Sequence, residues 1–198
     1  MKKYIILLIS LFCLTSCTQQ KIQTSESQGI EKQEETESSE ETEIVDENGT
    51  TYTKSFGTYH VPTGWIESST YSTTNKFFYV ADGTEQDTLP NNISINIGSN
   101  KYSAEDHIKF REAIVNQLVM QLPKDTMLNG SGSYTANDYI LYTFTFNVTE
   151  GDTTLAATQY YIVGDYKYVM VYESVYDGNT EEVDAIAKNM VDTFTWPE

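Results

Sequence analysis

The sequence predicts an α+β domain in which an antiparallel β-sheet is flanked by helices. Three features predict it: strands with alternating apolar and polar residues, short turn sequences between consecutive strands, and two amphipathic helical patterns. Each helix has an apolar side that must be buried against another element, and a sheet offers the faces for it. We therefore expect one globular domain over residues 51–198, a length that suits a single hydrophobic core.

The strand patterns lie in the middle and later parts of the chain. In Asn92–Ile97 the three isoleucines share one face, and in Tyr139–Val148 the inward face carries Ile140, Tyr142, Phe144, Phe146 and Val148. Two more apolar strands follow, at 153–163 and 166–176. Gly164–Asp165 between them is a two-residue hairpin signal, and the "EGD" of residues 150–152 links the preceding pair. The sequence therefore predicts three consecutive antiparallel strands from Tyr139 to Tyr176.

Two helices are predicted around these strands. The first begins at "SAED", where Ser103 can cap the helix and Asp106, three residues later, can bond back to the cap residue. Pro123 ends this helix. Its apolar side is expected to consist of Ile108, Val115, Leu118, Val119 and Leu122, widened by Phe110 and Ile114. The second helix opens with Asn179 or Thr180 as its cap. Its core side is expected to consist of Val183, Ile186, Ala187, Met190, Val191 and Phe194.

The N-terminus has the features of an export signal. Lys2 and Lys3 precede an apolar run that is too short to span a bilayer as a stable anchor, so residues 1–16 are predicted to be a signal peptide. The following "LTSC" resembles the bacterial lipobox, which implies that Cys17 receives a diacylglyceryl group and becomes the first residue. The alternative is cleavage elsewhere, with Cys17 incidental. Two acyl chains would hold the protein on the extracytoplasmic face of the cell membrane.

Residues 17–50 are predicted to be an acidic, disordered linker after the lipidated cysteine. They are rich in Glu, Ser, Thr and Gln and contain no aromatic residue, so they cannot bury enough surface to offset the entropy of ordering. The formal net charge of the whole chain is −17, which argues against nucleic acid as a partner and against electrostatic attachment to anionic lipid. Membrane attachment is therefore expected to come from the acyl chains.

The globular part resembles a known fold family. "YHVPTGW" at Tyr59–Trp65, followed by paired strands, a helix, long strands and a final helix with "IAKNMVDTF", is similar to the Mog1/PsbP-like domains. This resemblance implies an α/β/α sandwich of the kind that small bacterial lipoproteins carry after a polar spacer. Because such domains are known mainly as accessory proteins that bind other proteins, it also implies a non-catalytic role without a cofactor.

Tyrosines are the most unusual feature of the composition, with 15 in the chain. On the strand at 166–176, the tyrosines share one face, and Val169, Val171 and Val175 share the other with Lys167 and Glu173. The tyrosines could pack beneath a helix with their hydroxyls at the rim, or they could be exposed as a surface for a protein or glycan partner. The residues of this candidate binding surface are Tyr166, Tyr168, Tyr172 and Tyr176.

Candidates for catalysis are few. The sequence has two histidines, His60 and His107, and no metalloprotease or serine hydrolase motif. The loop "ADGTEQD" supplies three carboxylates, Asp82, Glu85 and Asp87, but lacks the spacing of an EF-hand. We expect a non-catalytic binding domain with no metal and no cofactor. The alternative is a small metal-dependent or hydrolytic enzyme that uses His60 and the loop carboxylates, which requires His60, His107 and Asp82 to come together.

Overall fold

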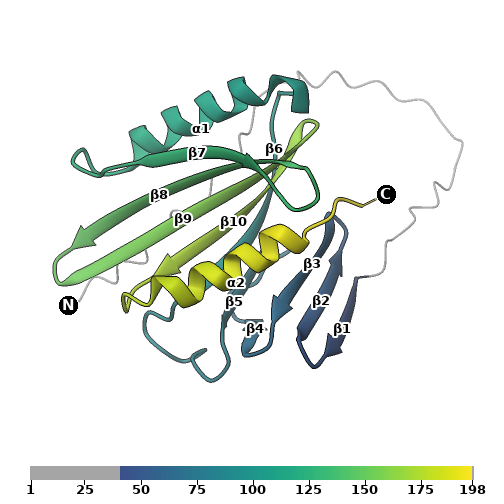
Figure 1. Ribbon diagram of the computed structural model, residues 1–198. Helices are drawn as coiled ribbons and strands as arrows, with labels where there is room; N and C mark the ends of the chain where they lie inside the picture. The colour runs from purple at the N-terminus through teal and green to yellow at the C-terminus, as the bar shows by residue number, and fades with distance from the viewer. Residues whose placement is uncertain (1–40, 198) are drawn as a thin grey trace, which may run out of the picture.

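The structure, a computed structural model, describes residues 41–197 as two antiparallel sheets and two α-helices (Figure 1). The strands are β1 (Thr42–Asp46), β2 (Gly49–Lys54), β3 (Gly57–Pro62), β4 (Trp65–Glu67), β5 (Lys76–Ala81), β6 (Asn92–Ser99), β7 (Asn129–Tyr134), β8 (Ile140–Glu150), β9 (Thr153–Gly164) and β10 (Lys167–Val175). The helices are α1 (His107–Gln121), preceded by one 3₁₀ turn at Ala104–Asp106, and α2 (Thr180–Thr193). The predicted α+β class, an antiparallel sheet flanked by helices, is confirmed.

The larger sheet has the strand order β4-β5-β6-β10-β9-β8-β7. The predicted meander is confirmed, since β9 pairs antiparallel with both β8 and β10. The turn between β9 and β10 consists of Asp165 and Tyr166, one residue later than the sequence predicts, because Gly164 still pairs with Lys167. Tyr166 takes the positive φ of 57° that the tight turn requires. Gly151, with a φ of 61°, serves the turn between β8 and β9.

The larger sheet separates two hydrophobic cores, because successive side chains of a strand point to opposite faces. On one face, α2 and the smaller sheet cover Ile93, Ile95, Leu141, Ile162, Val169 and Val171. On the other face, α1 covers Tyr142, Phe144, Phe146, Tyr161, Tyr168 and Tyr172. Four α2 side chains are buried as predicted: Val183, Ala187, Met190 and Val191. Figure 1 shows α1 along one side of the sheet and α2 across it.

The smaller sheet, of order β1-β2-β3, corrects the predicted linker boundary. Residue 50 was expected to end the disordered linker, but β1 and β2 form a hairpin over residues 42–54. Strand β3 joins this hairpin to the C-terminal segment through backbone hydrogen bonds between Thr58 and Thr195 of 2.8 and 2.9 Å. The folded part therefore begins before residue 51. The predicted signal peptide, Cys17 and the linker as far as residue 40 lie outside the described residues.

Helix α1 buries part of the apolar side that the sequence predicts. Phe110, Ile114, Leu118 and Leu122 are buried as predicted, whereas Ile108 and Val119 are 51% and 63% exposed. The buried residues follow a single i, i+4 row, which suffices for a helix that lies flat on a strongly aromatic sheet. Ser103 and Asn179, the predicted caps, make no side-chain hydrogen bond to the backbone of a helix terminus. Within residues 41–197, neither helix is long and apolar enough to cross a membrane.

Candidate binding surface

The tyrosines of β10 do not form one exposed surface. Tyr168 and Tyr172 are buried beneath α1, and the Tyr168 ring lies 5.3 Å from that of Phe110 between centroids. Only Tyr166, in the turn before β10, is largely exposed, and Tyr176 is partly buried at the opposite end. The interpretation of Tyr168 and Tyr172 as an exposed partner or glycan surface is therefore wrong. The alternative, with tyrosines packed under a helix, is confirmed for these two.

The two histidines lie on opposite faces of the larger sheet. His60 of β3 faces α2, where its Nδ1 lies 3.1 Å from the side-chain oxygen of Asn189. His107 begins α1 on the other face, and its Nδ1 lies 2.6 Å from the hydroxyl of Tyr142, on whose ring it stacks. Each imidazole is thus held by a neutral partner, and the constellation of His60, His107 and Asp82 does not form.

The loop carboxylates belong to an ordinary turn between β5 and β6. The backbone N–H of Thr84 donates to the carbonyl of Ala81, and that of Asp87 donates to the carbonyl of Thr84. These backbone hydrogen bonds shape the loop. Across residues 41–197, no group of three or more His, Cys, Asp or Glu side chains is arranged to hold a metal ion.

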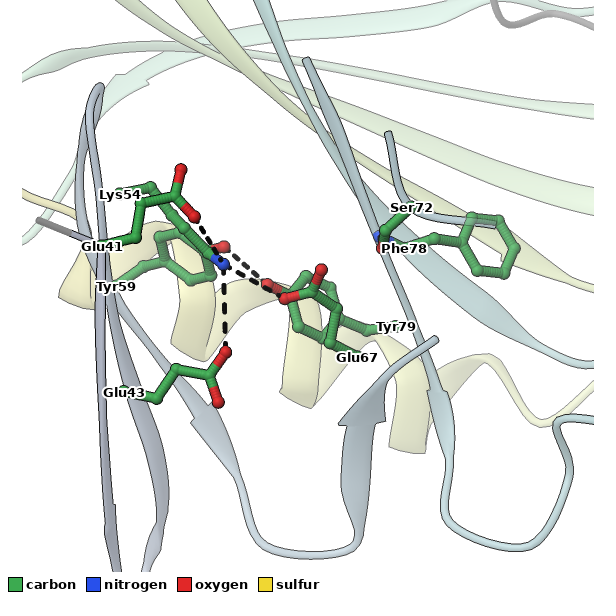
Figure 2. A network of polar contacts seen from close by, with 8 residues as sticks. All are labelled: Glu41, Glu43, Lys54, Tyr59, Glu67, Ser72, Phe78 and Tyr79. Atoms are coloured by element: carbon green, nitrogen blue, oxygen red, sulfur yellow. Dashed lines mark hydrogen bonds and ion pairs between the residues drawn. The ribbon is translucent and has the colours of Figure 1, made fainter. Parts of the chain in front are cut away.

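A buried lysine joins the two sheets (Figure 2). Lys54 extends from β2, and its Nζ lies 3.4 Å from Glu67 of β4, 3.4 Å from Glu41 and 4.0 Å from Glu43. The same ammonium group lies 4.7 Å from the centroid of the Phe77 ring. Because desolvating a charge is costly, the carboxylates and the ring face compensate it there. Through these ion pairs, Lys54 connects the start of the folded part to the larger sheet.

Beside the ion pairs of Lys54, the hydroxyls of Tyr59 and Tyr79 share a hydrogen bond in the core, which Figure 2 also shows. Burial raises the pKa of both phenols far above its ordinary value, so both remain protonated at neutral pH. Burial, with the negative charges of Glu43 and Glu67, raises the pKa of Tyr52 to about 12. None of these three phenols is therefore available as a phenolate base near pH 7.

A buried glutamate lies beneath α2. Glu173 occupies the valine face of β10 and is 1% exposed, and its Oε2 has no hydrogen-bond partner among the described residues. Burial, together with the hydrogen bond and charge of Asp184 on α2, raises its pKa to about 9. Sequence reasoning placed Glu173 on the valine face but did not identify it as buried. The signal was present, since a charged residue interrupts an otherwise apolar alternation.

Exposed apolar side chains gather on α1, the loop after it and β7, which Figure 1 shows running beside α1. We call these residues the α1–β7 surface: Ile108, Val119, Met120, Met127 and Tyr134. Met120 is 86% exposed and Met127 is 75% exposed. Apolar groups concentrated on one side of a protein mark interaction sites, and methionine adapts to irregular partner surfaces.

The chain segment that carries the α1–β7 surface is also nearly neutral. Residues 100–149 have four basic and five acidic side chains, a formal charge of −1, whereas residues 41–197 have eight basic and 22 acidic ones, a formal charge of −14. The acidic charge of the domain therefore lies mostly elsewhere. A partner that approaches α1 and β7 meets little electrostatic repulsion or attraction.

Comparisons with known proteins bear on the fold. No protein-family model matches the chain, and no curated protein sequence does. Among solved structures, LpqN of Mycobacterium tuberculosis, described as involved in cell envelope biogenesis, matches with a TM-score of 0.54. The match has 13% sequence identity and covers 80% of this chain and 91% of that chain. This chain has the LpqN fold.

Two further solved structures are similar at lower scores. PsbP of the cyanobacterium Synechocystis has a TM-score of 0.47 at 15% identity, over 79% of this chain and 92% of that chain. The Ran-binding protein Mog1p of Saccharomyces cerevisiae has a TM-score of 0.42 at 12% identity, over 79% of this chain and 95% of that chain.

Proposed function

We propose that this protein is a lipid-anchored, non-catalytic domain on the extracytoplasmic face of the bacterial cell membrane, where it binds a protein partner. The exposed apolar residues of the α1–β7 surface carry the proposal. Their exposure has a solvation cost that a monomeric domain usually avoids, and covering them with a partner would recover it. The involvement of LpqN, which has the same fold, in cell envelope biogenesis supports a role in the envelope.

A protein partner is favoured over a glycan. Glycan recognition by aromatic side chains needs exposed ring faces, and Tyr168 and Tyr172 are buried under α1. The α1–β7 surface instead offers aliphatic and thioether side chains on a near-neutral background, which suits an apolar protein surface. We infer a non-catalytic role because the two histidines lie on opposite faces of the larger sheet, His60 beside Asn189 and His107 beside Tyr142.

The lipid anchor is tested by replacing one cysteine at a time in cells that produce the full chain. Cys17→Ala should block processing or release the protein from membranes, because the acylated thiol is lost. Cys13→Ala is the matched control, since it removes the other cysteine of the same hydrophobic segment and should leave membrane association unchanged. Normal membrane partition of the Cys17→Ala protein would contradict the anchor.

Partner binding is tested separately with a photo-crosslinking amino acid at Met120, the most exposed residue of the α1–β7 surface. The control site is Thr70, which is exposed on the loop between β4 and β5. A single crosslinked protein at Met120, absent at Thr70 and lost when Val119 is also changed to Glu, is expected. Equal crosslinking at both sites, or insensitivity to Val119→Glu, would argue against this surface.

A further inference from the structure

Strand β7 leaves one edge of the larger sheet open. It pairs with β8 over six consecutive residues without a bulge, and nothing in residues 41–197 pairs with its other side. Its sequence, "NGSGSY", contains no charged residue and no proline, and all six residues are exposed. Natural sheets usually protect an edge with charges, proline, bulges or very short strands. Strand β1 carries Glu43 and Asp46, β4 has only three residues, and β3 is bonded to Thr195 of the C-terminal segment. Among the strands of residues 41–197, β7 is therefore the unprotected edge.

The backbone groups available at this edge follow from the register. The N–H of Thr135, the residue after β7, donates to the carbonyl of Tyr139 at 2.9 Å, so this pair is hydrogen-bonded to the β8 side. Bonding alternates along an antiparallel ladder, so residues 129, 131 and 133 also direct their N–H and C=O groups toward β8. Gly130, Gly132 and Tyr134 therefore direct theirs outward.

The same three residues share the face of the sheet that α1 covers. A Cβ atom at Gly130 would lie 3.0 Å from the Phe144 ring, and one at Gly132 would lie 3.0 Å from the Tyr142 ring. The aromatic rings of β8 thus lean against the glycines, and this face of β7 has no side chain until Tyr134, which is 68% exposed.

We propose that β7 pairs with β7 of a second copy of this chain, antiparallel and about a two-fold axis through Gly132. In this register, the outward N–H and C=O groups of Gly132 bond to those of the partner's Gly132. Gly130 of each copy bonds to Tyr134 of the other, and each exposed Tyr134 ring can lie over the bare backbone of the opposite Gly130. The two larger sheets become one continuous sheet, with both α1 helices on the same face.

Charge and symmetry favour a second copy as the occupant. A chain with a net charge of −17 repels itself on most of its surface, but the segment that contains α1 and β7 is nearly neutral. An isologous interface requires a self-complementary strand, and an uncharged strand with glycine on the axis meets that condition without opposing like charges. The pairing does not rest on the proposed lipid anchor or on a protein partner of another kind.

The test uses disulfide crosslinking between two differently tagged full-length copies produced in the same cells. In the proposed register, Ser131 of one copy lies opposite Ser133 of the other in a non-hydrogen-bonded pair, where Cα atoms approach within disulfide range. One copy carries Ser131→Cys and the other Ser133→Cys. After mild oxidation, this mixed pair should yield at least about tenfold more crosslinked dimer than Ser131→Cys or Ser133→Cys copies alone, whose thiols lie diagonally beyond disulfide range.

Two controls make the result decisive. The unaltered chain measures crosslinking through Cys13 and Cys17. A mixed pair of Asn147→Cys and Thr153→Cys, exposed residues of β8 and β9 outside the proposed contact, measures random collision. Adding Ser133→Lys to the Ser131→Cys copy and Ser131→Lys to the Ser133→Cys copy should abolish the dimer, because lysines enter the shared edge while exposed serines leave the fold intact. Equal crosslinking in all pairs, no dimer above the controls, or linkage only to a different protein would overturn the proposal.

Discussion

Replacing Glu173 should increase the free energy of unfolding at neutral pH. The carboxyl lies beneath α2, with Asp184 against it, and its pKa is raised from 4.5 to about 9. In the unfolded chain the same group releases its proton near its ordinary pKa. Folding at neutral pH therefore requires Glu173 to take up a proton. In Glu173→Gln, the amide keeps the size of the side chain and donates an N–H where the protonated carboxyl donates its O–H.

The sign and size follow from proton linkage. Between about pH 4.5 and 9, the folded state holds one more proton at Glu173 than the unfolded state. The contribution of this group to stability is complete below pH 4.5 and is lost as the pH rises toward 9, by about 1.4 kcal/mol per pH unit. Glu173→Gln should therefore stabilise the protein by about 3 kcal/mol at pH 7 and by less than about 1 kcal/mol at pH 5.

Urea unfolding followed by tryptophan fluorescence, for wild type and variant between about pH 5 and pH 8, measures this difference. The control is Glu150→Gln, an exposed glutamate at the end of β8, which should change the unfolding free energy little at any pH. Asp184→Asn should lower the folded-state pKa of Glu173 because it removes the neighbouring negative charge, so the loss of stability with rising pH should level off at a lower pH. A Glu173→Gln difference that does not grow with pH, or a less stable variant at pH 8, would refute the reasoning.

Three further predictions concern stability. Lys54→Met should lower the free energy of unfolding by about 1–3 kcal/mol, because Glu67 loses its cation, and Lys54→Met with Glu67→Gln should recover part of the loss in urea unfolding. Gly57→Ala should cost at least about 2 kcal/mol, since its φ is 151° and a Cβ would lie 2.4 Å from the carbonyl oxygen of Thr195. Gly64→Ala, at a φ of 90° with open space around it, should cost only about 1 kcal/mol. Equal costs for the two substitutions would contradict the role of the contact between residue 57 and Thr195. Deleting residues 18–40 should leave the melting temperature unchanged. Deleting residues 18–46 should lower it, because this deletion removes β1 and two ion-pair partners of Lys54. A large fall in melting temperature with the shorter deletion would contradict this reasoning.

The linker boundary shows where local composition misleads. Residues 41–50 share the acidic, aromatic-poor composition of the segment before them, which predicts disorder. They nevertheless form β1 and part of β2, because β2 pairs with β3 and Lys54 attracts Glu41 and Glu43. Strand β7 was likewise not predicted, because "NGSGSY" has poor strand propensity. The strand forms because the aromatic rings of β8 pack against its glycines.

Alternation and helical periodicity in the sequence were sufficient to predict the β8–β9–β10 meander, the core side of α2 and the α+β class. These patterns are local, and the need to bury a stripe of apolar side chains translates them directly into strands and helices. Only the tertiary structure decided which face of β10 is covered by which helix. Both faces of that strand are apolar enough to be buried. Its tyrosine face lies in the core because α1 packs on it, with Phe110 against Tyr168.

The separation of His60 from His107 and the pairing of Glu173 with Asp184 were also decided by the tertiary structure. They depend on which elements the sheet order brings together across long stretches of chain, and no local pattern encodes that order. The same holds for the α1–β7 surface. Its residues are apolar in the sequence like those of the core, and only the packing of α1 leaves them exposed to a partner.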